Sequence, residues 1–104
     1  MSKRKGTNAE RELIHKFWEN GFAAVRAAGS GSMKYPCSEL LVAGKGKIYA
    51  IECKVTKEQS KYFEKQEIEE LKTFSTFFNA KPLVAIKFKE PGWVFFDILD
   101  LKEK

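Results

Sequence analysis

The feature of this sequence that most restricts its fold is a β-hairpin signal in the middle of the chain. Residues Ile48–Val55 form a run of strand-type side chains, and Glu39–Ala43 form a shorter run before it. The segment Gly44–Lys47 separates the two, and its glycines are typical of a tight turn. We therefore predict two consecutive antiparallel strands, and hence a protein built on a β-sheet.

Two helices and three further strands are predicted around this hairpin. Thr7 and Glu10 match a capping box, and apolar residues recur at helical spacing from there to Asn20. A second helix is predicted over Glu64–Phe78, with an apolar stripe at the same spacing. Further strands are predicted over residues 22–26, 83–88 and 93–98. The order α-β-β-β-α-β-β predicts an α/β fold with a central mixed sheet flanked by helices.

The length of 104 residues suits one domain, 1–104, and leaves no room for a separate cofactor domain. No apolar run approaches the ~20 residues that span a bilayer, and no apolar stretch of a signal peptide follows the basic N-terminus. Two cysteines, Cys37 and Cys53, are too few for a disulfide framework or a zinc site. We therefore expect a reduced cytoplasmic protein, without membrane association or a small-molecule cofactor.

The positive charge is concentrated in the first half of the chain. Residues 1–57 carry eleven Lys/Arg and five Glu, whereas residues 58–104 carry eight Lys and nine acidic residues. A basic half favours a polyanionic partner, and nucleic acid is the commonest one, although a merely solubilising surface is the alternative. Residues 1–6 are predicted to form a flexible basic arm that contributes Lys3, Arg4 and Lys5.

The residues that point to chemistry lie on the hairpin. Glu52 and Lys54 interrupt an otherwise apolar strand and share one face of it. Glu39 opens the partner strand, so the hairpin can bring its carboxylate beside that of Glu52. Two such like charges need a cation or a proton between them. Carboxylate ligands suit Mg²⁺, and a neighbouring lysine can stabilise charge developing on phosphorus. This pattern predicts a metal-dependent phosphodiesterase; the alternative is an ion pair on a solvated sheet face.

Glu10 is a candidate third carboxylate, supplied by the first helix. Its alternative role is the capping box, and Glu12 is a rival for the same position. His15 has no evident catalytic partner, and neither cysteine has a histidine at a usual spacing, so we interpret these residues as structural.

Several segments, in this order and spacing, resemble the archaeal-type Holliday-junction resolvases (Hjc/Hje) of the restriction-endonuclease-like PD-(D/E)xK superfamily. They are Lys5–Ile14, Gly21–Arg26, Gly29–Ser32, Pro36–Gly44, Ile51–Val55, Lys61-Tyr62 and Pro82–Phe88. The resemblance implies a single restriction-endonuclease-like nuclease domain.

The resemblance also implies roles for individual residues. Glu39 and Glu52 are similar to the family's metal ligands, Glu10 to its helix carboxylate and Lys54 to its catalytic lysine. Ser30 is similar to the loop serine near the scissile phosphate. We expect Mg²⁺, with Mn²⁺ as an alternative, to be held by Glu39, Glu52 and the backbone carbonyl of Cys53, with Glu10 nearby. The expected DNA-binding residues are Lys3, Arg4, Lys5, Arg11, Arg26, Ser30, Ser32 and Lys34.

We therefore predict a Mg²⁺-dependent, structure-selective endonuclease that binds four-way junction DNA and resolves it as a homodimer, by paired cuts in opposed strands. We expect the dimer interface on the second helix and the last two strands, where apolar residues exceed what a small monomer can cover. The first alternative is another PD-(D/E)xK-type DNA endonuclease. The second is a non-catalytic DNA-binding module, since the family generally has Asp where this chain has Glu39.

Overall fold

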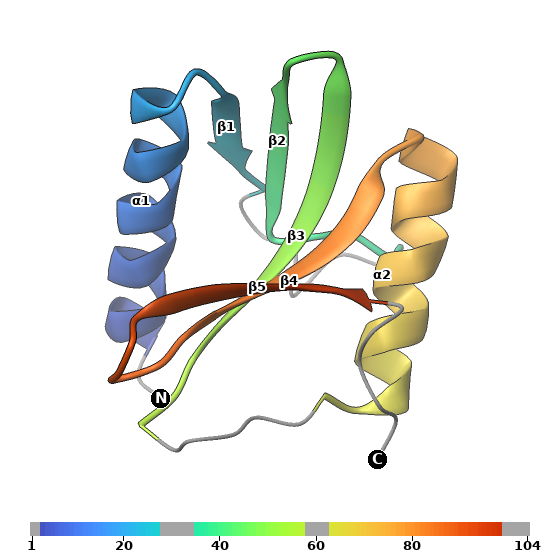
Figure 1. Ribbon diagram of the computed structural model, residues 1–104. Helices are drawn as coiled ribbons and strands as arrows, with labels where there is room; N and C mark the ends of the chain where they lie inside the picture. The colour runs from blue at the N-terminus through green and yellow to red at the C-terminus, as the bar shows by residue number, and fades with distance from the viewer. Residues whose placement is uncertain (1–2, 28–34, 58–62, 99–104) are drawn as a thin grey trace.

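The computed structural model describes residues 3–27, 35–57 and 63–98 of the chain. Within them the order of elements is the predicted α-β-β-β-α-β-β (Figure 1). The elements are α1 (Lys3–Glu19), β1 (Ala23–Arg26), β2 (Leu40–Gly44), β3 (Lys47–Val55), α2 (Lys65–Phe78), β4 (Lys81–Lys87) and β5 (Trp93–Asp97).

The described strands form a single mixed sheet in the order β1-β2-β3-β4-β5. Neighbouring strands are antiparallel except β3 and β4, which are parallel because α2 connects them. The predicted mixed sheet is thus confirmed, and β3, which carries Glu52 and Lys54, is its central strand.

The two helices lie on opposite sides of the sheet, so that each covers one of its faces (Figure 1). The core on the α1 side is built around Leu13, Leu40 and Ile51. The core on the α2 side contains Ile68 and Leu71 of the helix, packed with buried residues of β4. Because successive side chains of a strand point to opposite faces, Glu52 and Lys54 lie on the face opposite Ile51 and Cys53.

The predicted hairpin forms, and Gly44 and Gly46 at its turn explain its shape. Lys45 and Gly46 both have positive φ, 56° and 79°, as a two-residue turn between twisted strands requires. Gly44 meets Phe22 so closely that an added Cβ would lie 2.6 Å from its ring atom Cδ1. The turn thereby fixes the register that pairs Gly44 with Lys47 and, at the other end, Leu40 with Ile51.

The start of α1 differs from the prediction. The helix begins at Lys3, so residues 3–6 form its first turns rather than a flexible arm; residues 1–2 lie outside the described part. Lys and Arg are good helix formers, and one glycine in a helix costs only about 1 kcal/mol. The capping box at Thr7 and Glu10 is therefore wrong, because both residues lie inside the helix.

None of the helices in the described residues is long and apolar enough to cross a membrane.

Candidate active site

Glu39 and Glu52 come together at the open end of the β2–β3 hairpin. The register pairs Leu40 with Ile51, so the next residue on each side of that pair is a glutamate. Glu39 stands just before β2, and its Oε1 accepts a hydrogen bond of 2.7 Å from the backbone N–H of Cys53. The predicted juxtaposition of the two carboxylates is therefore present.

The pKa values of both carboxyl groups are raised. Burial, and then the negative charge of Glu39, raise the pKa of Glu52 to about 8 despite the opposing charge of Lys54. Burial also raises the pKa of Glu39, with Glu10 adding to the effect and the Cys53 N–H opposing it. Two buried carboxyl groups that resist ionising together favour the binding of a cation.

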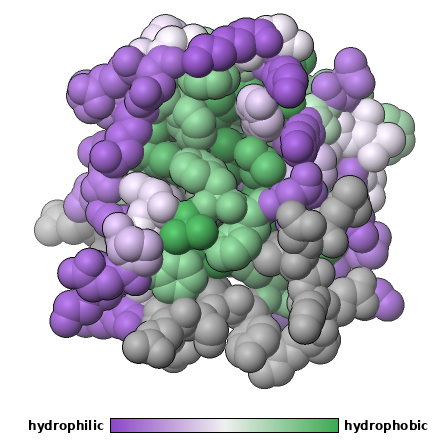
Figure 2. All heavy atoms as spheres, viewed as in Figure 1, coloured by the Kyte–Doolittle hydropathy of each residue, from purple (hydrophilic) through white to green (hydrophobic). Residues whose placement is uncertain are grey.

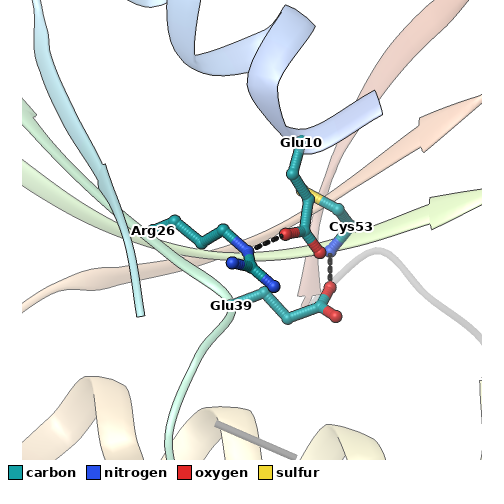
Figure 3. A network of polar contacts seen from close by, with 4 residues as sticks. All are labelled: Glu10, Arg26, Glu39 and Cys53. Atoms are coloured by element: carbon teal, nitrogen blue, oxygen red, sulfur yellow. Dashed lines mark hydrogen bonds and ion pairs between the residues drawn. The ribbon is translucent and has the colours of Figure 1, made fainter. Parts of the chain in front are cut away.

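Glu10 approaches the same place from α1. Its Oε1 accepts a hydrogen bond from Nε of Arg26 on β1 at 2.7 Å, and its side chain is largely buried. Figure 3 shows Arg26 reaching from the strand to Glu10, with the Glu39 carboxylate and the Cys53 amide beside this pair. The charge of Glu10 acts on Glu39 and Glu52.

The rival carboxylate, Glu12, has a different role. Its two oxygens accept hydrogen bonds from Nζ of Lys87 at 2.6 Å and from Nε1 of Trp93 at 2.8 Å. These two bonds, in that order, hold the pKa of Glu12 below its ordinary value. Glu12 therefore ties α1 to β4 and β5, and Glu10 is the helix carboxylate that faces the candidate site.

The lysine of the site has a partner that the sequence analysis did not identify. Nζ of Lys54 lies 2.7 Å from Oε2 of Glu67 in the first turn of α2. Burial works against the charged ammonium, but Glu67 and the other carboxylates outweigh it, and the pKa of Lys54 is raised. A signal for Glu67 was present: a helix that connects two parallel strands begins at the end of the sheet where the first strand ends, and β3 bears Lys54 near that end.

The donor set fits Mg²⁺ without forming a complete cage. Among the residues that the structure describes, no three His, Cys, Asp or Glu side chains form a preassembled metal-binding group. Mg²⁺ needs less than this, because it is usually bound by one or two carboxylates and keeps several waters. Glu39 and Glu52 would supply those two carboxylates. Because the pKa of each glutamate is raised, the two carboxyl groups retain protons more readily than free carboxyl groups do when no cation is bound.

The remaining predicted site residues are less fully placed. Arg11 is exposed on α1. Lys3, Arg4 and Lys5 lie within α1, and their side chains are outside the described part. Ser30, Ser32 and Lys34 also lie outside the described residues.

The side chains of His15, Cys37 and Cys53 show no sign of a catalytic role. His15 pairs with Glu19 on the exposed side of α1, at 3.4 Å. Both cysteines are free, and burial raises the thiol pKa of Cys37 and of Cys53. A raised pKa disfavours the thiolate that a cysteine nucleophile needs.

Comparison with known proteins places the chain among relatives of one kind. Residues 1–104 match the family model described as archaeal Holliday junction resolvase (Hjc). The chain is 45% identical over 97 residues to the crossover junction endodeoxyribonuclease Hjc of Archaeoglobus fulgidus, covering 92% of this chain and 71% of that protein. It is 40% identical over 85 residues to the Methanocaldococcus jannaschii protein of the same name, covering 82% of this chain and 60% of that one.

A solved structure agrees with these sequence matches. The structure of Archaeoglobus fulgidus Hjc, described as a Holliday junction resolvase from an archaeal hyperthermophile, superimposes with a TM-score of 0.90 at 37% sequence identity. The superposition covers 95% of this chain and 82% of the other. The fold class predicted from the sequence is therefore confirmed.

Proposed function

The chain belongs to the archaeal Holliday junction resolvase (Hjc) family, and we propose from this premise that it is a Mg²⁺-dependent endonuclease selective for four-way DNA junctions. The observation that carries the proposal is the meeting of Glu39, Glu52 and Lys54 at the end of the hairpin. There, burial and the charge of Glu39 raise the pKa of Glu52 to about 8. The endonuclease names of the relatives support the same reading.

Glu39, Glu52 and the backbone carbonyl of Cys53 would hold Mg²⁺, with Mn²⁺ as an alternative and Glu10 nearby. The chemistry that such a cation supplies when bound is polarisation of the scissile phosphate and a lower pKa for the attacking water. Lys54 would orient that water. Lys54 balances negative charge as it develops on the phosphate oxygens, since its ammonium group stays protonated.

Basic residues around the site would hold the DNA without reading its sequence. Arg26 stands beside Glu10 at the rim of the candidate site, and Arg11 is exposed on the neighbouring helix. Lys3, Arg4 and Lys5 extend the same basic helix. The loop residues Ser30, Ser32 and Lys34 remain proposed contacts, with Ser30 near the scissile phosphate. Phosphate contacts of this kind fix the position of a backbone and give affinity that depends on salt.

We infer a homodimer that cuts opposed strands, because a four-way junction has approximate two-fold symmetry that a symmetric dimer matches. Apolar surface supports this inference: Phe77 of α2 is 88% exposed and Phe95 of β5 is 45% exposed. Figure 2 shows hydrophobic residues gathered in the middle of the face that β5 crosses, between the more polar helices. β5 is an edge strand of the sheet, so a second copy can approach it.

The last strand is better covered within the monomer than the sequence analysis predicted. We expected one face of the last strand to lack a cover within the monomer. Instead, Phe17 of α1 packs edge-on against Phe95, with ring centroids 5.9 Å apart, and Phe96 packs against the core on the α2 side. The exposed apolar side chains that support a dimer are therefore Phe77 and Phe78 of α2 and, on the α1 side of the sheet, part of Phe95, rather than a whole uncovered face.

The deciding experiment is cleavage of a labelled synthetic junction with Mg²⁺, beside a linear duplex of the same sequence. We expect symmetric cuts in the junction only. Glu52→Gln should abolish cleavage and leave junction binding largely intact, because it removes a cation ligand and leaves the basic surface. Full cleavage by this variant would refute the assignment. Equal cutting of the duplex would favour another nuclease, and binding without cleavage by the wild type would favour a non-catalytic module.

A further inference from the structure

The ion pair of Lys54 joins it to the helix rather than to its own strand. Lys54 and Glu52 share a face of β3, and the charge of Glu52 acts on Lys54. The carboxylate within 2.7 Å of Nζ nevertheless belongs to Glu67 of α2. Among the described residues, Glu52 has no ion pair. The ammonium is thus drawn away from the neighbouring carboxylate on its strand.

Glu67 is itself held in place by the first turn of α2. Its Oε1 accepts a hydrogen bond of 3.2 Å from the backbone N–H of Glu64, while Oε2 faces Lys54. A carboxylate is also favoured at this position by the helix dipole. The helix is anchored by Ile68 and Leu71, which are buried against the sheet. One carboxylate therefore connects the start of a packed helix to the lysine of the candidate site.

The ion pair of Lys54 and Glu67 is partly shielded from water. The side chain of Lys54 is 26% exposed and that of Glu67 is 32% exposed. Charges at such sites interact more strongly than a fully solvated pair, because less water screens them. The ring of Phe63 lies under Nζ, 5.9 Å from it, and limits solvent on that side.

We propose that Glu67 is a positioning residue that holds Lys54 by an ion pair and thereby leaves Glu52 available to bind Mg²⁺. This inference rests on the proposed function, because it requires Glu52 to be a cation ligand. Without Glu67, the nearest carboxylates to the ammonium are those of the metal site. An ion pair between Lys54 and Glu52 would then compete with Mg²⁺ for the same oxygens.

The test is a double-mutant cycle in which Mg²⁺ binding to the full chain is measured by titration calorimetry without DNA. Glu67→Gln removes the charge, but its amide oxygen can still accept the Glu64 N–H, so the helix start is preserved. We expect this variant to bind Mg²⁺ about tenfold more weakly, which corresponds to a pair interaction of about 1.4 kcal/mol. In a Lys54→Met background, Glu67→Gln should weaken Mg²⁺ binding about twofold or less, because the only effect left is the loss of a distant, screened charge.

Glu69→Gln is the matched control, because it removes the same charge from an exposed position on the same helix. It should leave Mg²⁺ binding unchanged. Equal weakening by Glu67→Gln in both backgrounds, or none in either, overturns the inference. Circular dichroism and urea unfolding of every variant exclude a folding defect as the cause.

The cycle separates failure of this inference from failure of the proposed function. If wild type binds no Mg²⁺, or if Glu52→Gln binds it as well as wild type does, the metal assignment itself falls. If Glu52→Gln loses Mg²⁺ and Glu67→Gln does not, the metal assignment stands and the role given to Glu67 is wrong.

Discussion

Without metal, the carboxyl pair of the candidate site should make this protein less stable as the pH rises. An unfolded Glu52 ionises near its ordinary pKa of 4.5, whereas in the folded chain the pKa is about 8. Between these values the folded state holds a proton that the unfolded state has lost, so the free energy of unfolding falls with rising pH. Glu39, whose pKa is also raised, acts in the same direction.

The size of the effect follows from the shift. One pKa unit corresponds to about 1.4 kcal/mol, so the change from 4.5 to about 8 sets an upper limit of about 5 kcal/mol for Glu52. That is a large share of the ~5–15 kcal/mol that stabilises a domain. The lowered pKa of Glu12 and the raised pKa of Lys54 act outside the range pH 5–8, so they leave the slope unchanged there.

The assay is urea unfolding at pH 5, 6, 7 and 8, followed by tryptophan fluorescence at one fixed protein concentration in a metal chelator. Glu52→Gln should match wild type near pH 5 and exceed its stability by about 2–5 kcal/mol at pH 8. Saturating Mg²⁺ at matched ionic strength should remove most of the pH dependence of wild type, because it binds the ionised form. Glu69→Gln, an exposed control, should follow wild type throughout.

A flat wild-type profile between pH 5 and 8 without metal would refute the reasoning. So would a Glu52→Gln variant that loses stability with pH as steeply as wild type. Either result would mean that Glu52 does not retain a proton in the folded chain above its ordinary pKa, which is the premise of the prediction.

Two further predictions concern DNA binding and assembly. Junction affinity should fall with salt at a log–log slope of roughly −0.9 per phosphate contact, and Arg11→Ala should lower the steepness by about one contact; binding that is the same at low and physiological salt would contradict the electrostatic picture. Light scattering at micromolar concentration should give twice the chain mass of 11.9 kDa, and Phe77→Asp should shift the mass toward one chain; a wild-type mass of a single chain would refute the paired-cut mechanism.

The parts of the fold that were predictable are those with strong local signals. The hairpin follows from a run of strand-type residues and a turn whose Gly46 adopts φ 79°. The second helix was predicted to start at Glu64 and starts at Lys65. It was predictable because its apolar residues recur at helical spacing and form a stripe on one face. The proximity of Glu39 and Glu52 followed from the same hairpin, since register is fixed once the turn is fixed.

The parts that were missed depend on contacts between distant segments. The local pattern of Thr7 and Glu10 matches a capping box, but Glu10 is engaged by Arg26, sixteen residues away. Glu10 and Glu12 lie on different faces of α1 by helix geometry, but only the contacts of Glu12 with Lys87 and Trp93 show which of the two faces away from the site. The role of Glu67 was missed because its contact with Lys54 joins a helix to a strand thirteen residues before it in the sequence.

The position of the site follows from the unequal lengths of two neighbouring strands. β2 begins at Leu40, which pairs with Ile51, whereas β3 continues to Val55 beside β4. Beyond Ile51, β3 is therefore not paired with β2. Oε1 of Glu39 accepts the hydrogen bond from the Cys53 N–H that a backbone carbonyl of β2 would otherwise accept. This bond orients the Glu39 carboxylate, whose pKa is raised by burial and by the neighbouring Glu10. The charged groups thus gather where the end of β2 leaves a backbone donor of β3 free to orient a carboxylate.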